Sequence, residues 1–199
     1  MYAIASLLDS ASDQIVRDLW NRFEFNCGLT GIKITPLPHF SWMGAEAYQL
    51  KPVEQILEEE AQRTTPFVVR AAGLGLFAGV RPVVYIPLIK DETLLRTHML
   101  LWERIRPHAL APNGYYHPTR WMPHITLAFH EADPDRLGCA VEDIAFQRIE
   151  FKIVVDHFAV IYQSEGKAGL HSRSPFGTYP SFERGNSEFP DFSSGLAQG

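Results

Sequence analysis

The sequence predicts an α+β protein of two similar lobes, each built in the order strand, helix, strand, helix, strand. Two observations predict this fold. Segments with the two-residue period of strands alternate with segments that have the 3.6-residue period of helices, and this order of segments occurs twice. The residues themselves hardly repeat. The expected lobes are residues 1–78 and 79–163, which face one another with pseudo-two-fold symmetry around a central cleft.

The first predicted lobe begins with a short apolar strand over residues 2–8. Ser12 and Asp13 are expected to cap a helix, because short polar side chains bind the free N–H groups at helix starts. Gly28 is expected to end that helix, because glycine breaks helical periodicity. The other elements expected in this lobe are a strand over 32–42, a helix over 51–63 and a strand over 67–77.

The same order recurs in the second predicted lobe. A strand over 83–89 is followed by a helix that Asp91 is expected to cap. A loop rich in proline, asparagine and glycine comes next, as is typical of a chain that leaves regular structure. The other elements expected here are a strand over 123–129, a helix over 133–144 and strands over 149–155 and 158–162.

The last segment, residues 164–199, differs in composition from the rest of the chain. It is rich in glycine, serine and proline and has no period. Such composition predicts a flexible or loosely docked tail, so the expected folded domain is residues 1–163. Phe176 and other scattered aromatic residues leave a second option, in which the tail covers an apolar surface or the mouth of the cleft.

Composition and charge limit the class of protein. Hydrophobic residues make up 46% and charged residues 21%, which is typical of a soluble globular protein. The net charge of −5 argues against extended nucleic-acid binding but allows the binding of one phosphate or nucleotide end. No membrane-spanning run or basic leader is evident. Cys27 and Cys139 form no CxxC pair, so we expect free thiols in a reducing cytoplasm. We also expect the protein to be a monomer.

Three of the eight histidines are followed two positions later by a hydroxyl residue: His39-Phe40-Ser41, His117-Pro118-Thr119 and His124-Ile125-Thr126. About one such match is expected by chance, so a single motif carries little weight. The motifs at His39 and His124 share a preceding proline, alternating apolar residues and a place on the middle strand of a predicted lobe. His117 lies instead in the predicted loop.

Strand geometry gives the two shared motifs a chemical meaning. Alternate side chains of a strand lie on one face, so His39 and Ser41 share a face, as do His124 and Thr126. If the lobes face each other, two imidazoles and two hydroxyls meet in one cleft. Hydroxyls can hold a phosphodiester, while one neutral imidazole accepts a proton and one protonated imidazole donates one. No metal-ligand spacing occurs, so no metal or cofactor is expected.

Two other functions are compatible with these residues. A nucleotide-binding protein could keep the cleft and do little chemistry, although the presence of both histidines weighs against it. A hydrolase could instead use Ser41 as its nucleophile. That hydrolase is disfavoured because Ser41 shares a strand face with His39 and has neither a nucleophile-elbow context nor an evident orienting carboxylate.

The paired motifs His39-Phe40-Ser41-Trp42 and His124-Ile125-Thr126-Leu127 resemble those of the two-histidine (2H) phosphoesterase superfamily, which includes the 2′-5′ RNA ligases and 2′,3′-cyclic phosphodiesterases. The resemblance covers residues 1–162. It implies a bilobal fold and metal-free phosphoester chemistry on cyclic nucleotides or RNA ends. It also implies that His39 and His124 are the acid–base pair, in either order, and that Ser41 and Thr126 bind phosphate.

Four further residues near the motifs are candidates for substrate contacts. Tyr115 and Tyr116 precede the second motif, where an aromatic ring could stack on a base, although loop packing is the simpler explanation for both. Arg120 and Arg81 could approach a phosphate, although most arginines are only solvated. The acidic chain lacks the basic rim typical of a protein that binds tRNA. This favours a small nucleotide or an RNA terminus as the substrate.

Overall fold

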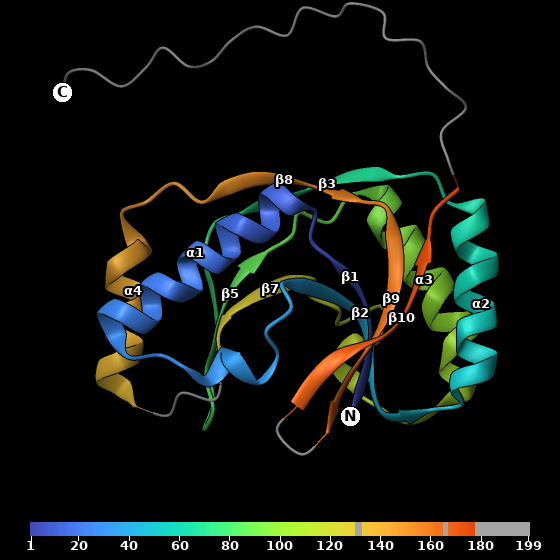
Figure 1. The fold of residues 1–199 in the computed structure, drawn as a ribbon, viewed down its shortest axis with the longest axis horizontal. Helices are drawn as coiled ribbons and strands as arrows, with labels where there is room; N and C mark the ends of the chain where they lie inside the picture. The colour runs from blue at the N-terminus through green and yellow to red at the C-terminus, as the bar shows by residue number, and fades with distance from the viewer. Residues whose placement is uncertain (130–132, 165–166, 178–199) are drawn as a thin grey trace, which may run out of the picture.

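The protein has a mixed α+β fold, as the sequence predicts (Figure 1). The computed structural model describes residues 1–129, 133–164 and 167–177. The helices are α1 (Ser10–Cys27), α2 (Leu50–Arg63), α3 (Glu92–Ile105) and α4 (Pro134–Ala145), with 3₁₀ turns η1 (Gly31–Ile34), η2 (Arg106–His108) and η3 (Gly114–Tyr116). The strands are β1 (Tyr2–Leu7), β2 (His39–Tyr48), β3 (Phe67–Ala72), β4 (Gly75–Phe77), β5 (Val83–Pro87), β6 (Ala109–Pro112), β7 (His124–Ala128), β8 (Glu150–Val155), β9 (His157–Ser164) and β10 (Lys167–Pro175).

The main sheet brings the two motif strands together. Its strand order is β10-β9-β1-β2-β7-β5-β4, and β6 also pairs with β2. The motif strands β2 and β7 are therefore neighbours near the middle of this sheet. The remaining strands, β3 and β8, form a separate two-stranded antiparallel sheet.

The predicted lobe boundaries at 1–78 and 79–163 need correction, because elements are exchanged between the two halves of the chain. Helix α1 packs against α4 and β7, whereas α2 packs against α3, β9 and β10. The two pairs of helices lie at opposite ends of the molecule (Figure 1). Strands β3 and β8, one from each half, pair with each other. Periodicity shows which face of an element is apolar, but it does not show which partner covers that face.

Helix ends follow the expected chemistry with one change of position. The N-cap of α1 is Asp9, whose side chain accepts hydrogen bonds from the backbone N–H groups of Ala11 and Ser12, so the predicted cap at Ser12 or Asp13 is wrong. Gly28 ends α1 in the left-handed conformation with φ +68°, as predicted. Asp91 caps α3, also as predicted.

Strand β10 corrects the prediction that the folded domain ends at residue 163. This strand lies within the segment predicted as a tail, yet it pairs along its length with β9. Phe176, the residue that follows it, is buried and packs against Phe67 and Phe158. Its backbone N–H also donates to the carbonyl of Asp156. The rest of the predicted tail, residues 178–199, lies outside the described residues.

An aromatic stack in the core supports the motif strands from behind. Trp121 lies between Trp42, at 5.7 Å between ring centroids, and His98, at 3.7 Å. His98 is 1% exposed, and burial lowers the pKa of its imidazole to about 4. This imidazole is therefore neutral at physiological pH, and it stacks on Trp121 in its uncharged form.

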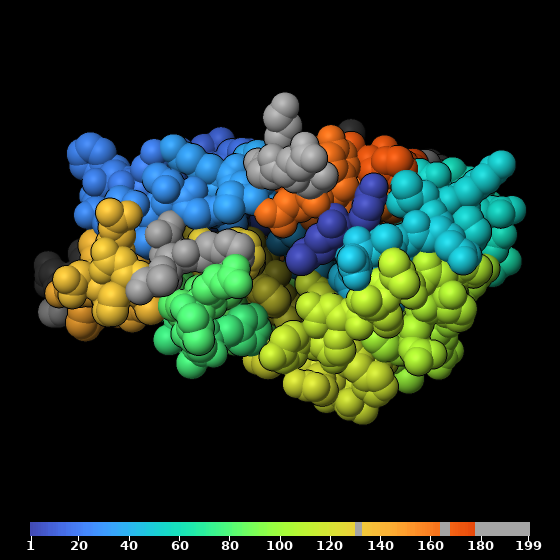
Figure 2. All heavy atoms as spheres, turned by 90° about the horizontal axis from the view of Figure 1, so that it is seen from below, coloured from blue at the N-terminus to red at the C-terminus, as the bar shows by residue number. Residues whose placement is uncertain are grey.

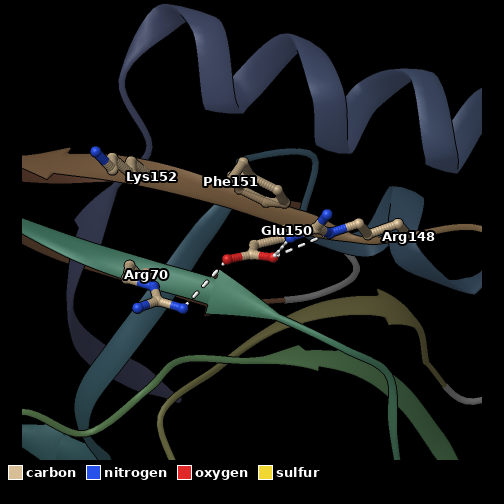
Figure 3. Close-up of a pocket in the computed structure, with 5 residues that line it drawn as sticks. All are labelled: Arg70, Arg148, Glu150, Phe151 and Lys152. Carbon is tan, nitrogen blue, oxygen red and sulfur yellow. Dashed lines mark hydrogen bonds and ion pairs between the residues drawn. The ribbon is translucent and has the colours of Figure 1, made fainter. Parts of the chain in front are cut away.

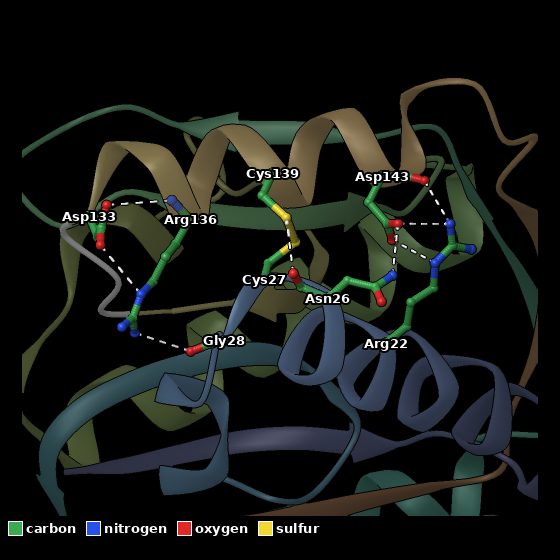
Figure 4. Close-up of a disulfide and its surroundings, with 8 residues drawn as sticks. All are labelled: Arg22, Asn26, Cys27, Gly28, Asp133, Arg136, Cys139 and Asp143. Carbon is green, nitrogen blue, oxygen red and sulfur yellow. Dashed lines mark hydrogen bonds and ion pairs between the residues drawn. A yellow bond between two sulfur atoms is a disulfide. The ribbon is translucent and has the colours of Figure 1, made fainter.

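A disulfide between Cys27 and Cys139 contradicts the prediction of free thiols. It joins the end of α1 to α4, beside an ion pair of Arg22 with Asp143 and a hydrogen bond from Arg136 to the carbonyl of Gly28 (Figure 4). Two cysteines 112 residues apart form no local motif, so spacing could not predict this pair. The cytoplasmic location, which relied partly on reduced thiols, stays a prediction. Among the described residues, no helix is long and apolar enough to cross a membrane.

We expect reduction of this disulfide to lower the free energy of unfolding by about 2–4 kcal/mol, because the bridge closes a long loop of the unfolded chain. Denaturant unfolding with and without reductant measures this loss. The double variant Cys27→Ser/Cys139→Ser should match the reduced wild type and should not respond to reductant. Two free thiols in the unreduced, denatured wild type, or equal unfolding midpoints, would contradict the expectation.

Candidate active site

The register of β2 on β7 brings the two motifs onto one face of the sheet. The strands are antiparallel, and Phe40 pairs with Ile125. Continuing this register places the hydroxyl residue of each motif directly opposite the histidine of the other. Opposite residues share a face, with Cβ atoms about 4.5–5.5 Å apart. The four residues that this register groups on one face are His39, Ser41, His124 and Thr126.

Burial along both strands alternates in step with this arrangement. Phe40 and Trp42 are 0% exposed, and Ile125 and Leu127 are each 1% exposed. The four polar motif residues between them are all partly exposed. Figure 2 shows a hollow between the green segment around β4 and the dark-blue start of the chain, with olive-yellow residues of the β7 region in its depth. The polar face is therefore accessible, and the apolar face belongs to the core.

Both imidazoles are held by the same backbone contact. Nδ1 of His39 lies 2.6 Å from the carbonyl oxygen of Leu37, and Nδ1 of His124 lies 2.7 Å from that of Met122. A carbonyl oxygen can only accept, so each Nδ1 must carry hydrogen and donate it. This leaves Nε2 of each ring free to accept or donate the proton that takes part in a reaction.

The two imidazoles are also coupled electrostatically. Burial lowers the pKa of His39 below 6.5, and the neighbouring charge of His124 lowers this pKa further. Burial likewise lowers the pKa of His124. Two cations this close repel each other, so the pair favours holding one proton over holding two. A bound anion would favour the protonated forms and raise both pKa values.

Two tryptophan indoles hold the backbone beneath the motif hydroxyls. The indole N–H of Trp20, on α1, donates to the carbonyl of Thr126 at 3.0 Å. The indole N–H of Trp121, which precedes β7, donates to the carbonyl of Ser41 at 3.1 Å. Sequence reasoning assigned neither tryptophan to the site, because each contact joins residues far apart in the chain. The indoles therefore act as positioning groups for the hydroxyl residues.

An aromatic wall, which the sequence analysis also missed, stands beside His124. The rings of Phe77 and Tyr85 are stacked with centroids 4.1 Å apart, and they lie 5.0 Å and 5.1 Å from the ring of His124. Gly75 makes room for Tyr85, because a Cβ at Gly75 would lie 2.3 Å from the tyrosine ring. Tyr85 pairs directly with Thr126 across β5 and β7, so this wall borders the polar face.

Of the four predicted substrate contacts, the structure brings Tyr116 to a motif. Its hydroxyl forms a hydrogen bond with the side chain of Ser41, and burial raises the pKa of the phenol. Tyr115 is exposed and pairs with Arg120, whose guanidinium carbon lies 5.0 Å from the ring centroid. Arg81 is exposed in the loop between β4 and β5. The roles of Tyr115, Arg120 and Arg81 stay predictions.

The histidine of the third motif is bound within its own loop. Nδ1 of His117 lies 2.9 Å from the hydroxyl of Thr119, so these two side chains bind each other in the loop after η3. Across residues 1–129, 133–164 and 167–177, no group of three or more His, Cys, Asp or Glu residues is placed to hold a metal ion.

Comparison with known proteins identifies the family. The family model described as the 2′-5′ RNA ligase superfamily matches residues 34–167, a range that contains both motif strands. The chain belongs to this superfamily. Residues 34–167 also contain Trp121, Phe77 and Tyr85, whereas Trp20 precedes the matched range.

Individual relatives agree with membership of the superfamily. A Bacillus pumilus (strain SAFR-032) protein named "Putative phosphoesterase" is 24% identical over 164 residues, which cover 82% of this chain and 90% of that protein. The Thermus thermophilus protein TT0787 has a similar fold, with a TM-score of 0.60, 18% identity, and coverage of 88% of this chain and 97% of TT0787. E. coli LigT complexed with 3′-AMP gives a TM-score of 0.60, 14% identity and the same coverages.

We expect Trp20→Phe and Trp121→Phe to weaken phosphate binding at the motif face about threefold to tenfold, because each removes an N–H donor that positions a hydroxyl residue. Titration of inorganic phosphate measures this effect. Trp102→Phe is the matched control, since the indole of Trp102 packs against His117 and lies outside the motif strands. Equal phosphate affinity in all three variants would show that the indoles serve stability alone.

Proposed function

We propose that this protein is a phosphoesterase that opens 2′,3′-cyclic phosphates, or makes and breaks 2′-5′ phosphodiester bonds, at the ends of nucleotides or RNA. The observation that carries the proposal is the grouping of two imidazoles and two hydroxyls on one face by the pairing of Phe40 with Ile125. The complexes of E. coli LigT with phosphate and with 3′-AMP support a nucleotide phosphate as the ligand class.

The four polar side chains divide the work of the reaction. The hydroxyls of Ser41 and Thr126 donate to the non-bridging oxygens and hold the phosphate. Nε2 of one histidine takes a proton from water as the new P–O bond forms. Nε2 of the other donates a proton to the ribose oxygen as the old P–O bond breaks. The two histidines exchange roles when the reaction runs in the ligation direction, so one geometry serves hydrolysis and ligation.

The surroundings favour a short substrate. The chain carries a net charge of −5, which repels a long polyanion. The aromatic wall of Phe77 and Tyr85 beside His124 offers a surface for the ribose or base attached to the reacting phosphate. We therefore propose a mononucleotide or an RNA terminus as the substrate, and a mechanism that needs neither metal nor cofactor.

We expect His39→Ala and His124→Ala each to lower kcat/KM by roughly 10²–10⁴-fold on 2′,3′-cyclic mononucleotides, since each removes one partner in proton transfer. The assay contains a chelator, and wild-type turnover should survive it. His117→Ala is the matched control, because it removes the histidine of the third motif and should leave the rate unchanged.

Three outcomes of this experiment separate the hypotheses. Full activity in either motif variant would contradict the catalytic assignment. Loss of wild-type turnover in chelator would contradict a metal-free mechanism. Tight nucleotide binding without turnover would support the alternative, a binding protein of the same fold.

We expect kcat/KM to follow a bell-shaped pH dependence centred on the acid side of pH 6.5. The reactive form of the free enzyme has one proton on the pair, and burial lowers the pKa of both His39 and His124. The bound phosphate anion raises both pKa values, so the kcat profile should be centred at higher pH. A kcat/KM that still rises above pH 7 would contradict these lowered pKa values.

A further inference from the structure

The β3–β8 sheet carries a cavity lined largely by cationic side chains. Its volume is about 260 Å³, and its lining residues are Arg70, Arg148, Glu150, Phe151 and Lys152 (Figure 3). Arg70 and Lys152 are directly opposite each other in the register of β3 on β8. Three cations and one carboxylate give the cavity a local charge opposite in sign to the net charge of −5 of the whole chain. Such a site attracts an anion.

Glu150 holds the two guanidinium groups and leaves most of their donors open. Its Oε1 accepts from Nη2 of Arg70 at 3.1 Å, and its Oε2 accepts from Nε and Nη2 of Arg148 at 3.2 Å and 2.7 Å. A guanidinium has five N–H donors, so most of those on Arg70 and several on Arg148 stay available. Lys152 has no ion-pair partner among the described residues. These donors suit a phosphate group.

The cavity is linked to the motif face through neighbouring strands. His124 pairs with Pro87 of β5, and the next residue, Leu88, forms a bridge with Ala71 of β3. Arg70 is adjacent to Ala71. Two interstrand spacings of about 4.8 Å and two residue steps of about 3.3 Å place the Cα atoms of Arg70 and His124 within roughly 16 Å of each other.

We propose that the basic cluster of Arg70, Arg148 and Lys152 binds a backbone phosphate of an oligonucleotide whose cyclic 3′ end occupies the motif face. This inference rests on the proposed function, and it adds a second contact point for the substrate. At the duplex spacing of about 3.4 Å per nucleotide, the path corresponds to about five nucleotides, and to fewer in an extended strand. Mononucleotides are too short to reach the cluster.

A length series tests the proposal. The substrates are oligonucleotides of one to eight nucleotides that share the same cyclic 3′ end, and the readout is KM at several salt concentrations. For wild type, KM should fall once the chain reaches about three to five nucleotides. The variant Arg148→Gln/Lys152→Gln should raise KM for the longer substrates roughly three- to tenfold and leave mononucleotide kinetics unchanged.

Salt dependence and a control complete the design. Loss of the one phosphate contact made by the cluster should reduce the slope of log affinity against log salt by up to about 0.7, since each neutralised phosphate of a single strand contributes about 0.7. Lys51→Gln, which removes one exposed cation from α2, should behave as wild type. Equal length dependence in wild type and the double variant would overturn the proposal, as would equal changes for mononucleotide and oligonucleotide.

A binding experiment on the same variants distinguishes failure of this inference from failure of the proposed function. If no substrate is turned over, the proposed catalysis fails, and fluorescence anisotropy with 3′-phosphorylated oligonucleotides of the same lengths replaces KM. A gain in affinity with length that the double variant removes would then support the cluster. Affinity that is independent of length or of the two substitutions would overturn it.

Discussion

The antiparallel pairing of β2 with β7 at Phe40 and Ile125 is the constraint on which the site depends. A slip of one residue would turn the polar side chains of one strand into the core and bring its large apolar side chains to the surface. The cost of burying a histidine and a hydroxyl while exposing Phe40 and Trp42 opposes such a slip. Burial of the apolar partners therefore maintains the register that groups the polar side chains.

The contact between the two motif strands is short, and other parts of the molecule support it. Trp20 donates from α1 to the carbonyl of Thr126, and Trp121 donates to that of Ser41 from within the stack with Trp42 and His98. The disulfide and the ion pair of Arg22 with Asp143 join α4 to α1, the helix that carries Trp20. Contacts between elements from the two halves of the chain thus support the pairing of β2 with β7.

Local patterns predicted the polar and apolar faces of the motif strands, because the side-chain period of a strand needs only neighbouring residues. The same patterns could not predict the contact of Trp20 with Thr126 or the bond of Cys27 to Cys139, since each requires knowledge of which elements meet. Composition is a poor guide to structure at β10, which pairs with β9 despite its glycine and serine residues. Gly169 there lies against Tyr162, where a Cβ would be 2.8 Å from the tyrosine hydroxyl, so close packing and not flexibility accounts for this glycine.

Charge distribution connects the motif face with the basic cluster on β3 and β8. The chain is acidic overall, so a long polyanion gains little from approaching it at random. Screening at physiological salt acts over about 8 Å, which is shorter than the estimated path of roughly 16 Å between the two sites. Each site therefore acts on the phosphate that lies within it. A chain end with correctly spaced phosphates can occupy both sites, whereas the interior of a long strand meets the cluster without presenting a terminus to the histidines.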